Sequence, residues 1–300
     1  MKMTPKVSIV CAWYNRADYI ADTLDSLLAQ DFDDFEVIIV NDGSSDPRVK
    51  DIFDAYNDRR LMVVHQQNTG FTGAIRRAIE LSTGEYIAVQ GSGDISAPDR
   101  IKKQVELLSE SEEIAIVGSG CTQVAAKSKF RRRYFKPVGE CSLDSLKVNM
   151  PFVHGTAMYR KEYYVAAGGY DPRFKYCSDW DLFFRMLERG RIVGLDLPLY
   201  EQRMFDDGFS FSPVHKFKQL WYKDRAINRS SESRELLEKA DEIVSKISAE
   251  DTANMKNSIL YAIKAFAKFD FTNSWQWFLL VIRQVVALLN KLKISRSQAF

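Results

Sequence analysis

Short apolar runs alternate with amphipathic stretches through the first third of the chain. The apolar runs are rich in Val and Ile, which is typical of buried β-strands. They lie at 7–11, 36–40, 61–65 and 85–89, and helical patterns follow them at about 18–30, 47–56, 70–81 and 98–108. Strands that alternate with helices predict an α/β fold, a mostly parallel, doubly wound sheet with helices on both faces.

The pattern changes after residue 109. Further strands are predicted at 114–118, 152–160 and 192–199, a β excursion with a basic run at 124–134, and a helix at 179–189 that Gly190 caps. Beyond about residue 212 the composition shifts towards helix. We therefore expect an α/β domain at 1–212 and a helical C-terminal extension at 213–300.

The extension ends in a strongly apolar stretch, 274–292, which opens with tryptophans. Arg283 interrupts this stretch, and the run is shorter than the ~20 residues that a membrane-spanning helix needs. An amphipathic helix lying on a membrane surface fits the pattern. A helix packed on its own domain or on a second subunit fits it equally, so peripheral membrane contact and a homo-oligomer both stay open.

The composition limits the cellular compartment and the classes of binding partner that we expect for this chain. The 42 Lys and Arg nearly balance the 40 Asp and Glu, so no global charge favours nucleic acid. Four widely spaced cysteines without a CxxC motif indicate neither a zinc site nor a disulfide framework, and favour a reducing cytoplasm. The N-terminus leads directly into the first predicted strand without a secretory apolar segment, which also favours a cytoplasmic location.

Polar residues gather where the predicted strands end. Asp42 directly follows the second strand, and Gln-Gly-Ser-Gly-Asp at 90–94 follows the fourth. In a doubly wound sheet, ligands bind outside the carboxyl ends of the strands, and the start of the next helix favours an anion. This edge is therefore the predicted site of a phosphate-bearing ligand.

Several motifs, taken in order, resemble family 2 glycosyltransferases of the GT-A (Rossmann-like) fold, the type that builds bacterial surface polysaccharides. They are VSIVCAWYN at 7–15, VNDGSSD at 40–46, NTG at 68–70 with GEYI at 84–87, and GYD at 169–171 with SDWDL at 178–182. The resemblance covers about 7–210. It implies an inverting enzyme that moves a sugar from a nucleotide-diphosphate donor, chiefly a UDP-sugar, to a saccharide or lipid-linked acceptor.

The resemblance places donor-binding residues at the strand ends. Asp42 would accept a hydrogen bond from the base or the ribose, and Tyr14 and Asn15 would lie against the same group. The alternative for Asp42 is an Asx turn that caps the following helix. Arg203 matches an arginine of the family, whereas Arg76 stands where relatives commonly have Asn. We hypothesise that both neutralise the diphosphate. A solvated helix face is the alternative for Arg76.

The metal motif of the family falls on 91–94, where this sequence departs from it. Gly91 and Gly93 stand at positions that are usually acidic, so Asp94 alone remains to hold Mg²⁺ or Mn²⁺. Phe205 stands where the family often has histidine. We therefore expect metal binding to be weak or dispensable, with the two arginines and the helix after Pro98 balancing the charge.

The resemblance makes Asp179 the catalytic residue, a general base that deprotonates the acceptor hydroxyl. Capping of the helix that starts there is the alternative. Asp181 is expected to pair with Arg185 one turn later. His154 and Trp180 would lie on the acceptor side, and structural roles remain open for both.

Two other functions remain open. The two glycines at 91 and 93 are compatible with a degenerate protein that binds a nucleotide sugar without transferring it. A nucleotidyltransferase shares a wound sheet, but that class usually has a glycine-rich loop after its first strand. Residues 12–15, Ala-Trp-Tyr-Asn, do not provide such a loop.

Overall fold

The structure is a computed structural model that describes residues 4–126, 131–134, 139–205, 219, 222–229, 235 and 237–238. The chain divides into two compact units, 1–205 and 206–300. The fold described below is that of the first unit, because most of the second unit, including the predicted helix 274–292, lies outside the described residues. None of the helices in the described ranges has the length and apolar character of a membrane-spanning segment.

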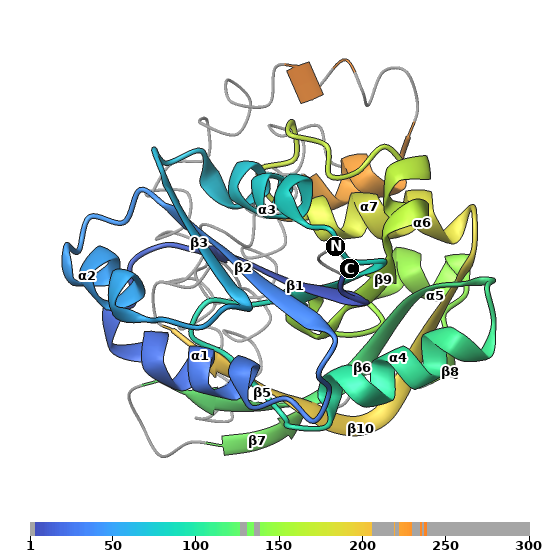
Figure 1. Cartoon of the computed structure of the whole chain (residues 1–300). Helices are drawn as coiled ribbons and strands as arrows, with labels where there is room; N and C mark the ends of the chain where they lie inside the picture. The colour runs from blue at the N-terminus through green and yellow to red at the C-terminus, as the bar shows by residue number, and fades with distance from the viewer. Residues whose placement is uncertain are drawn as a thin grey trace, which may run out of the picture. The chain divides into compact units, whose positions relative to one another are not determined.

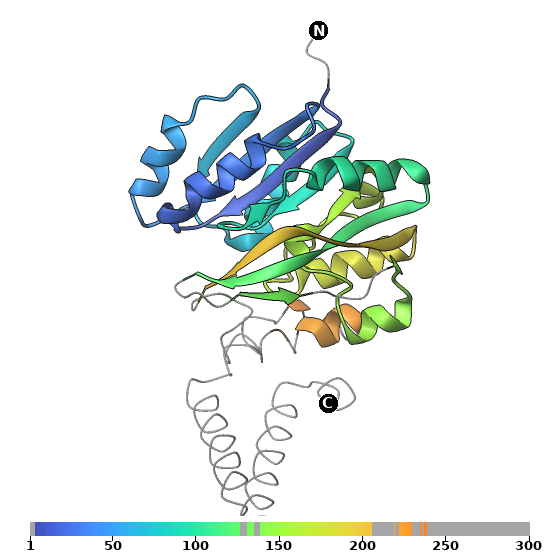
Figure 2. The ribbon, with the colours of Figure 1, turned by 90° about the horizontal axis from the view of Figure 1, so that it is seen from below.

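A mixed sheet forms the centre of the first unit, with strand order β3-β2-β1-β4-β9-β6-β10-β5 (Figure 1). The strands are β1 (Val7–Trp13), β2 (Phe35–Asp42), β3 (Leu61–Gln66), β4 (Tyr86–Gln90), β5 (Ile95–Ser96), β6 (Ile114–Ala125), β7 (Arg131–Tyr134), β8 (Gly139–Glu140), β9 (Met158–Arg160) and β10 (Arg191–Met204). The first four strands pair in parallel, which confirms the predicted wound half. Figure 2 shows β6, β7 and β10 side by side, with β6 parallel to β10.

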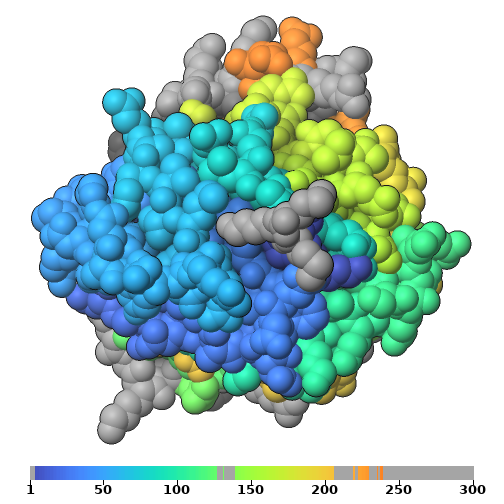
Figure 3. All heavy atoms as spheres, viewed as in Figure 1, coloured from blue at the N-terminus to red at the C-terminus, as the bar shows by residue number. Residues whose placement is uncertain are grey.

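Helices cover both faces of this sheet. They are α1 (Ile20–Leu28), α2 (Arg48–Ala55), α3 (Gly70–Leu81), α4 (Arg100–Glu110), α5 (Leu143–Val148), α6 (Lys161–Ala166) and α7 (Ser178–Leu187), with the 3-10 turns η1 (Ala17–Tyr19) and η2 (His154–Thr156). In Figure 1, α1 and α4 lie on one side of the sheet and α3, α6 and α7 on the other. The space-filling view in Figure 3 shows the blue and cyan segments that carry β2, α2, β3 and α3 on the left of the same view.

Alternation along β1 builds the two cores. Ile9 lies beside Val37 of β2 and Ala88 of β4, and all three join the core that packs against α1 and α4. The next residue, Val10, points to the other face and is equally buried. Because both faces are covered, these strands are apolar throughout rather than alternating, as their sequences show.

The predictions differ from the structure mainly after residue 109. The apolar run 152–157 is not a strand: residues 154–156 form η2, and only β9 is extended. Here the hydroxyl of Thr156 donates to the carbonyl oxygen of Val153 at 2.8 Å, which stabilises a turn. The run is apolar because it is buried, a property that strands and turns share. The short helices α5 and α6 were not predicted.

We predict that Gly118→Ala lowers the free energy of unfolding by about 1–3 kcal/mol, because a methyl group must be inserted into a filled core. A Cβ at Gly118 of β6 would lie 2.1 Å from the ring of Phe152. Urea denaturation of the single variants and of Gly118→Ala/Phe152→Ala measures their coupling. The loss caused by Gly118→Ala should shrink in the Phe152→Ala background. Strict additivity would contradict this account.

Candidate functional site

The loops after β1 and β2 are fastened to each other by Asn15. Its backbone is left-handed, with φ of +56°, an uncommon conformation for a residue other than glycine. Its side-chain oxygen accepts hydrogen bonds from the amides of Ser45 (2.9 Å) and Asp46 (3.2 Å). Asn15 therefore fixes the loop after β1 against the loop after β2. Tyr14 beside it is 47% exposed, so its ring can meet a ligand.

Asp42 is held in place by the start of α3. The side chain is only 3% exposed, and its Oδ1 accepts from the Thr69 amide (2.8 Å), the Thr69 hydroxyl (3.1 Å) and Gln66 (2.8 Å). The alternative role as a cap of α2 is wrong, because Asp46 accepts from the Arg48 amide there. Within the described residues no hydrogen bond reaches Oδ2 of Asp42, so this oxygen is available to a ligand.

Asp94 is buried in the loop that follows β4. Its Oδ2 accepts from the Tyr200 hydroxyl and its Oδ1 from the Arg203 amide, both at 2.8 Å. Burial raises the pKa of this carboxyl to about 6, although these hydrogen bonds and the nearby arginines oppose the rise.

The packing of this loop explains why glycine stands at the two positions of the metal motif that are usually acidic in the family. A Cβ at Gly91 would lie 2.3 Å from Oδ2 of Asp94. A Cβ at Gly93, whose φ is +86°, would lie 2.8 Å from the ring of Phe205. Acidic side chains at these two positions therefore do not fit this conformation of the loop.

The residues present do not fit a divalent cation. Mg²⁺ and Mn²⁺ prefer several oxygen ligands, whereas this loop offers the single carboxylate of Asp94, which is 7% exposed and has both oxygens directed at β10. Across the described ranges, no three His, Cys, Asp or Glu side chains gather as metal ligands would. This geometry does not itself support the expected role of Asp94 as a metal ligand, because the carboxylate fastens the loop to β10.

Two arginines form hydrogen bonds with the backbone of the same loop. Arg203 donates to the carbonyl oxygen of Gly93 at 3.2 Å, and Arg16 donates to that of Ser92 at 3.1 Å. The guanidinium of Arg16 lies 3.7 Å from the ring centroid of Phe205. The ring at the position of the family histidine therefore serves as a stacking platform for a cation.

The three groups expected to replace a metal differ in their partners. Arg203 forms an ion pair with Asp22 at 2.6 Å. The first turn of α4 is also engaged, because the Ile101 amide donates to Gln30. Arg76 of α3 is half-buried and makes no hydrogen bond or ion pair with a described residue, so its charge remains available to a ligand.

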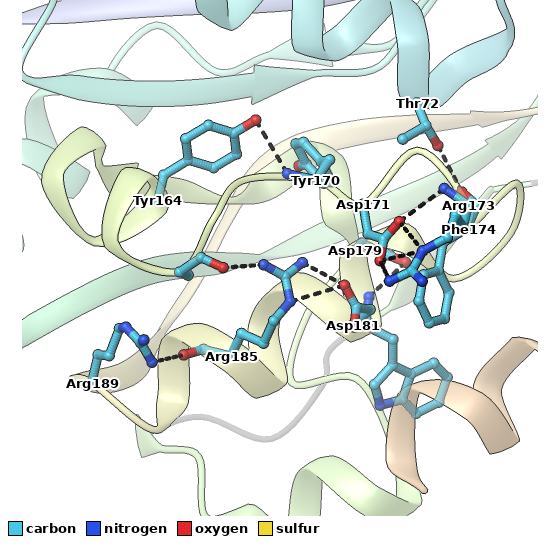
Figure 4. Close-up of polar contacts among 12 residues, drawn as sticks. Thr72, Tyr164, Tyr170, Asp171, Arg173, Phe174, Asp179, Asp181, Arg185 and Arg189 are labelled. Atoms are coloured by element: carbon cyan, nitrogen blue, oxygen red, sulfur yellow. Dashed lines mark hydrogen bonds and ion pairs between the residues drawn. The ribbon is translucent and has the colours of Figure 1, made fainter. Parts of the chain in front are cut away.

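Asp179 lies in the first turn of α7, which the close-up of Figure 4 shows. Among the described residues, its Oδ1 accepts from the amide of its neighbour Trp180, at 2.9 Å. The N-cap position of α7 is Cys177, so Asp179 lies inside the helix and is not its N-cap. Asp181 instead binds Arg185 at 3.0 Å, which confirms the expected pair. The half-buried Asp179 carboxylate thus takes no part in the ion pair that Asp181 forms with Arg185.

The two acceptor-side residues have defined structural contacts. His154 Nε2 lies 2.6 Å from the Tyr170 hydroxyl, and its ring meets that of Phe71 with centroids 5.7 Å apart. Burial lowers the pKa of His154, while the negative charge of Asp179 opposes that shift. The indole N–H of Trp180 donates to a backbone carbonyl of α5 at 2.8 Å.

The first turns of α3 connect Asp42, expected at the donor, to His154, expected at the acceptor. Thr69 holds Asp42, and Phe71 contacts His154. The Thr72 hydroxyl donates to a carbonyl in the loop before α7, at 2.8 Å (Figure 4). The structure therefore brings Asp42, His154 and Asp179 around one helix end, although they are far apart in the sequence.

Sequence reasoning missed two buried side chains behind the site, Tyr200 and Arg100. Arg100 is fully buried and donates to Gln104, one turn later on α4, at 3.1 Å. Its place beside the apolar position Ile101 was a usable signal, because an arginine there has to find buried partners. Tyr200 carried no comparable local signal.

The family model described as Glycosyl transferase family 2 matches residues 8–166, more than half of the chain. EpsE of Bacillus subtilis (strain 168), a protein named as a glycosyltransferase, is 30% identical over 215 residues, which are 70% of this chain and 77% of EpsE.

Solved structures share the fold at low identity. TarS 1–349 of S. aureus, in complex with UDP, is 18% identical with a TM-score of 0.59, over 94% of this chain and 91% of that one; of a longer TarS chain the match covers 42%. The mannosyltransferase PcManGT of Pyrobaculum calidifontis, with GDP-Man and Mn²⁺, is 17% identical with a TM-score of 0.61, over 96% and 88%. The fold is GT-A, and the chain belongs to glycosyltransferase family 2 and is a glycosyltransferase.

Proposed function

We propose that the chain transfers a sugar from a UDP-sugar to a saccharide or lipid-linked acceptor, with inversion at the anomeric carbon. The observation that carries this proposal is the start of α3, which holds Asp42 on one side and contacts His154 on the other. A donor bound at Asp42 then lies next to the residues that face the acceptor. TarS was solved with UDP and with UDP-GlcNAc, which favours uridine.

Each of these side chains has its own role in the proposed transfer reaction. Oδ2 of Asp42 accepts from the base or ribose, and Tyr14 lies along the same group. The Asp179 carboxylate takes the proton of the acceptor hydroxyl as that oxygen attacks the anomeric carbon. The bond to the diphosphate breaks on the opposite face of the sugar, so the configuration inverts and UDP leaves. His154 and Trp180 line the acceptor side.

Positive side chains balance the charge of the leaving UDP. Arg76 has no described partner, and Arg203 and Arg16 surround the loop at 91–94. Positioned cations stabilise developing charge in such transfers. We propose that these arginines take the place of a tightly held metal ion.

The wider setting is also part of the proposal. We place the enzyme in bacterial surface polysaccharide assembly at the cytoplasmic face of the membrane. A lipid-linked acceptor would be presented there, and an amphipathic helix at 274–292 would keep the enzyme at that surface.

Calorimetric titration of the full chain with UDP, GDP and TDP, with Mn²⁺ or with EDTA, tests the donor and the metal together. UDP should bind most tightly, with the same affinity in both buffers, because arginines rather than a metal neutralise it. UDP binding that requires Mn²⁺ would overturn the metal-independent site. Failure of all three nucleotides to bind would overturn the proposed donor.

Asp179→Asn should lower the rate of sugar transfer by about 10²- to 10⁴-fold, because an amide cannot accept the proton. UDP affinity should be unchanged. The matched control is Asp144→Asn, which alters an exposed carboxylate on α5. Rates come from transfer and donor hydrolysis assays with a panel of acceptors. Full activity of Asp179→Asn would refute the assignment of the base.

Asp94 should make stability depend on pH in a defined direction. Its pKa is raised to about 6 from 3.8, so between these values the folded chain keeps a proton that the unfolded chain has lost. Stability from this group is present at low pH and falls as pH rises, by about 2 kcal/mol between pH 4.5 and 7. The reference variant is Asp94→Asn, whose side chain has no titrating proton.

Unfolding of both proteins in urea at the two pH values, with and without Mn²⁺, measures the effect. Mn²⁺ should leave the difference between them unchanged. A gain for the wild-type chain alone at pH 7 on adding Mn²⁺ would show that Asp94 holds the ion.

A further inference from the structure

The hydroxyl of Tyr200 lies where three segments of the site meet. It accepts a hydrogen bond from the Gly91 amide and donates one to Oδ2 of Asp94, each at 2.8 Å. A Cβ added to Gly155, the residue after His154, would lie 2.5 Å from the same oxygen. One oxygen atom from β10 therefore contacts both ends of the loop 91–94 and the turn η2.

The direction of these bonds is fixed by chemistry. The Gly91 amide can only donate, so the phenol proton must point to Asp94. The Arg203 amide donates to the other oxygen of Asp94. The loop is thus closed against β10 by two residues of one strand, Tyr200 and Arg203.

A buried arginine supports the ring of Tyr200 from behind. The guanidinium of Arg100 lies 5.1 Å from the ring centroid. It also donates to the carbonyl oxygen of Val89 (2.7 Å) and to the side chains of Gln90 (2.9 Å) and Ser96 (2.8 Å). These partners flank the loop on both sides. The position of Tyr200 is therefore set by packing that is independent of any ligand.

The middle of the loop remains able to bind an anion. Arg16 and Arg203 hold the carbonyl oxygens of Ser92 and Gly93. In the described part of the chain, the amides of these two residues donate to no backbone oxygen. Amide donors and two guanidinium groups thus meet at the end of β4, where a sheet of this kind binds phosphate groups.

We propose that Tyr200 is a positioning residue that fixes the loop 91–94 in the shape that receives the donor diphosphate. It acts through Gly91 and Asp94 and does not itself touch the donor. The inference rests on the proposed function, since it assumes that a nucleoside diphosphate binds here. It adds the role of Tyr200, whose hydroxyl supports the diphosphate side of the donor site and not the nucleoside side.

Tyr200→Phe tests this role because it removes the hydroxyl alone. UDP affinity should fall about tenfold, as expected for a lost buried hydrogen bond, whereas uridine affinity should stay the same. Calorimetry with the full chain measures UDP, and competition against UDP measures uridine. Asp42→Asn should instead weaken both ligands.

Tyr86→Phe is the matched control. Tyr86 is another buried tyrosine of the sheet, at the far end of β4, where its hydroxyl accepts from Arg160 at 3.2 Å. This variant should leave both affinities unchanged. Gly155→Ala, which crowds the Tyr200 hydroxyl from η2, is a second variant expected to weaken UDP selectively. Melting temperatures confirm that the variants are folded.

The possible failures are distinguishable. If the wild-type chain does not bind UDP, the proposed function fails. If the wild-type chain binds UDP, but Tyr200→Phe and Gly155→Ala keep the wild-type ratio of UDP to uridine affinity, the role of Tyr200 is wrong. Equal loss of UDP and uridine binding in Tyr200→Phe would also overturn it, because the hydroxyl would then support the whole pocket.

Discussion

The burial of the Asp94 carboxylate constrains the rest of the site. A buried charge is costly unless donors compensate for it, and here both oxygens are occupied by β10. Because the carboxylate points back into the protein, a side chain at 91 would collide with it, and the ring of Phe205 leaves no room for one at 93. The inward carboxylate and this ring together account for the departure from the acidic motif and for the poor fit to a metal ion.

The arginines around the site illustrate how partners decide the role of a charge. Arg100 is fully buried, and burial lowers its pKa to about 10, yet its N–H groups bind neutral oxygens. It is committed to the structure. Arg203 shares its charge with Asp22, whereas Arg76 has no described partner. Three residues of one type therefore range from a buried scaffold residue to one without a described ion-pair partner, according to what surrounds them.

Periodicity in the sequence was sufficient for the first half of the fold and insufficient for the second. The helix predicted at 70–81 has the same bounds as α3. Its apolar stripe is clear, and it connects parallel strands, where a helix is expected. The helices α5 and α6 each contain six residues, too few for a stripe to emerge. The run before β9 was misassigned because burial alone made it apolar.

The same limit applies to the site. Asp42 and Asp94 were predicted at strand ends, and both lie there. Tyr200 was missed because its partner Asp94 is 106 positions away, so only the folded sheet reveals the contact.

The helix α3 connects Asp42 and His154, which are proposed to serve the donor and the acceptor, although no hydrogen bond joins the two residues. Thr69 binds Asp42, and two residues later Phe71 packs on His154. A shift of this helix end would move Asp42 and the ring of His154 together. The side chain of Phe71 is 39% exposed. Under the proposed function, a bound acceptor would contact the same turn that orients Asp42, and occupancy of one half of the site would then adjust the other through α3.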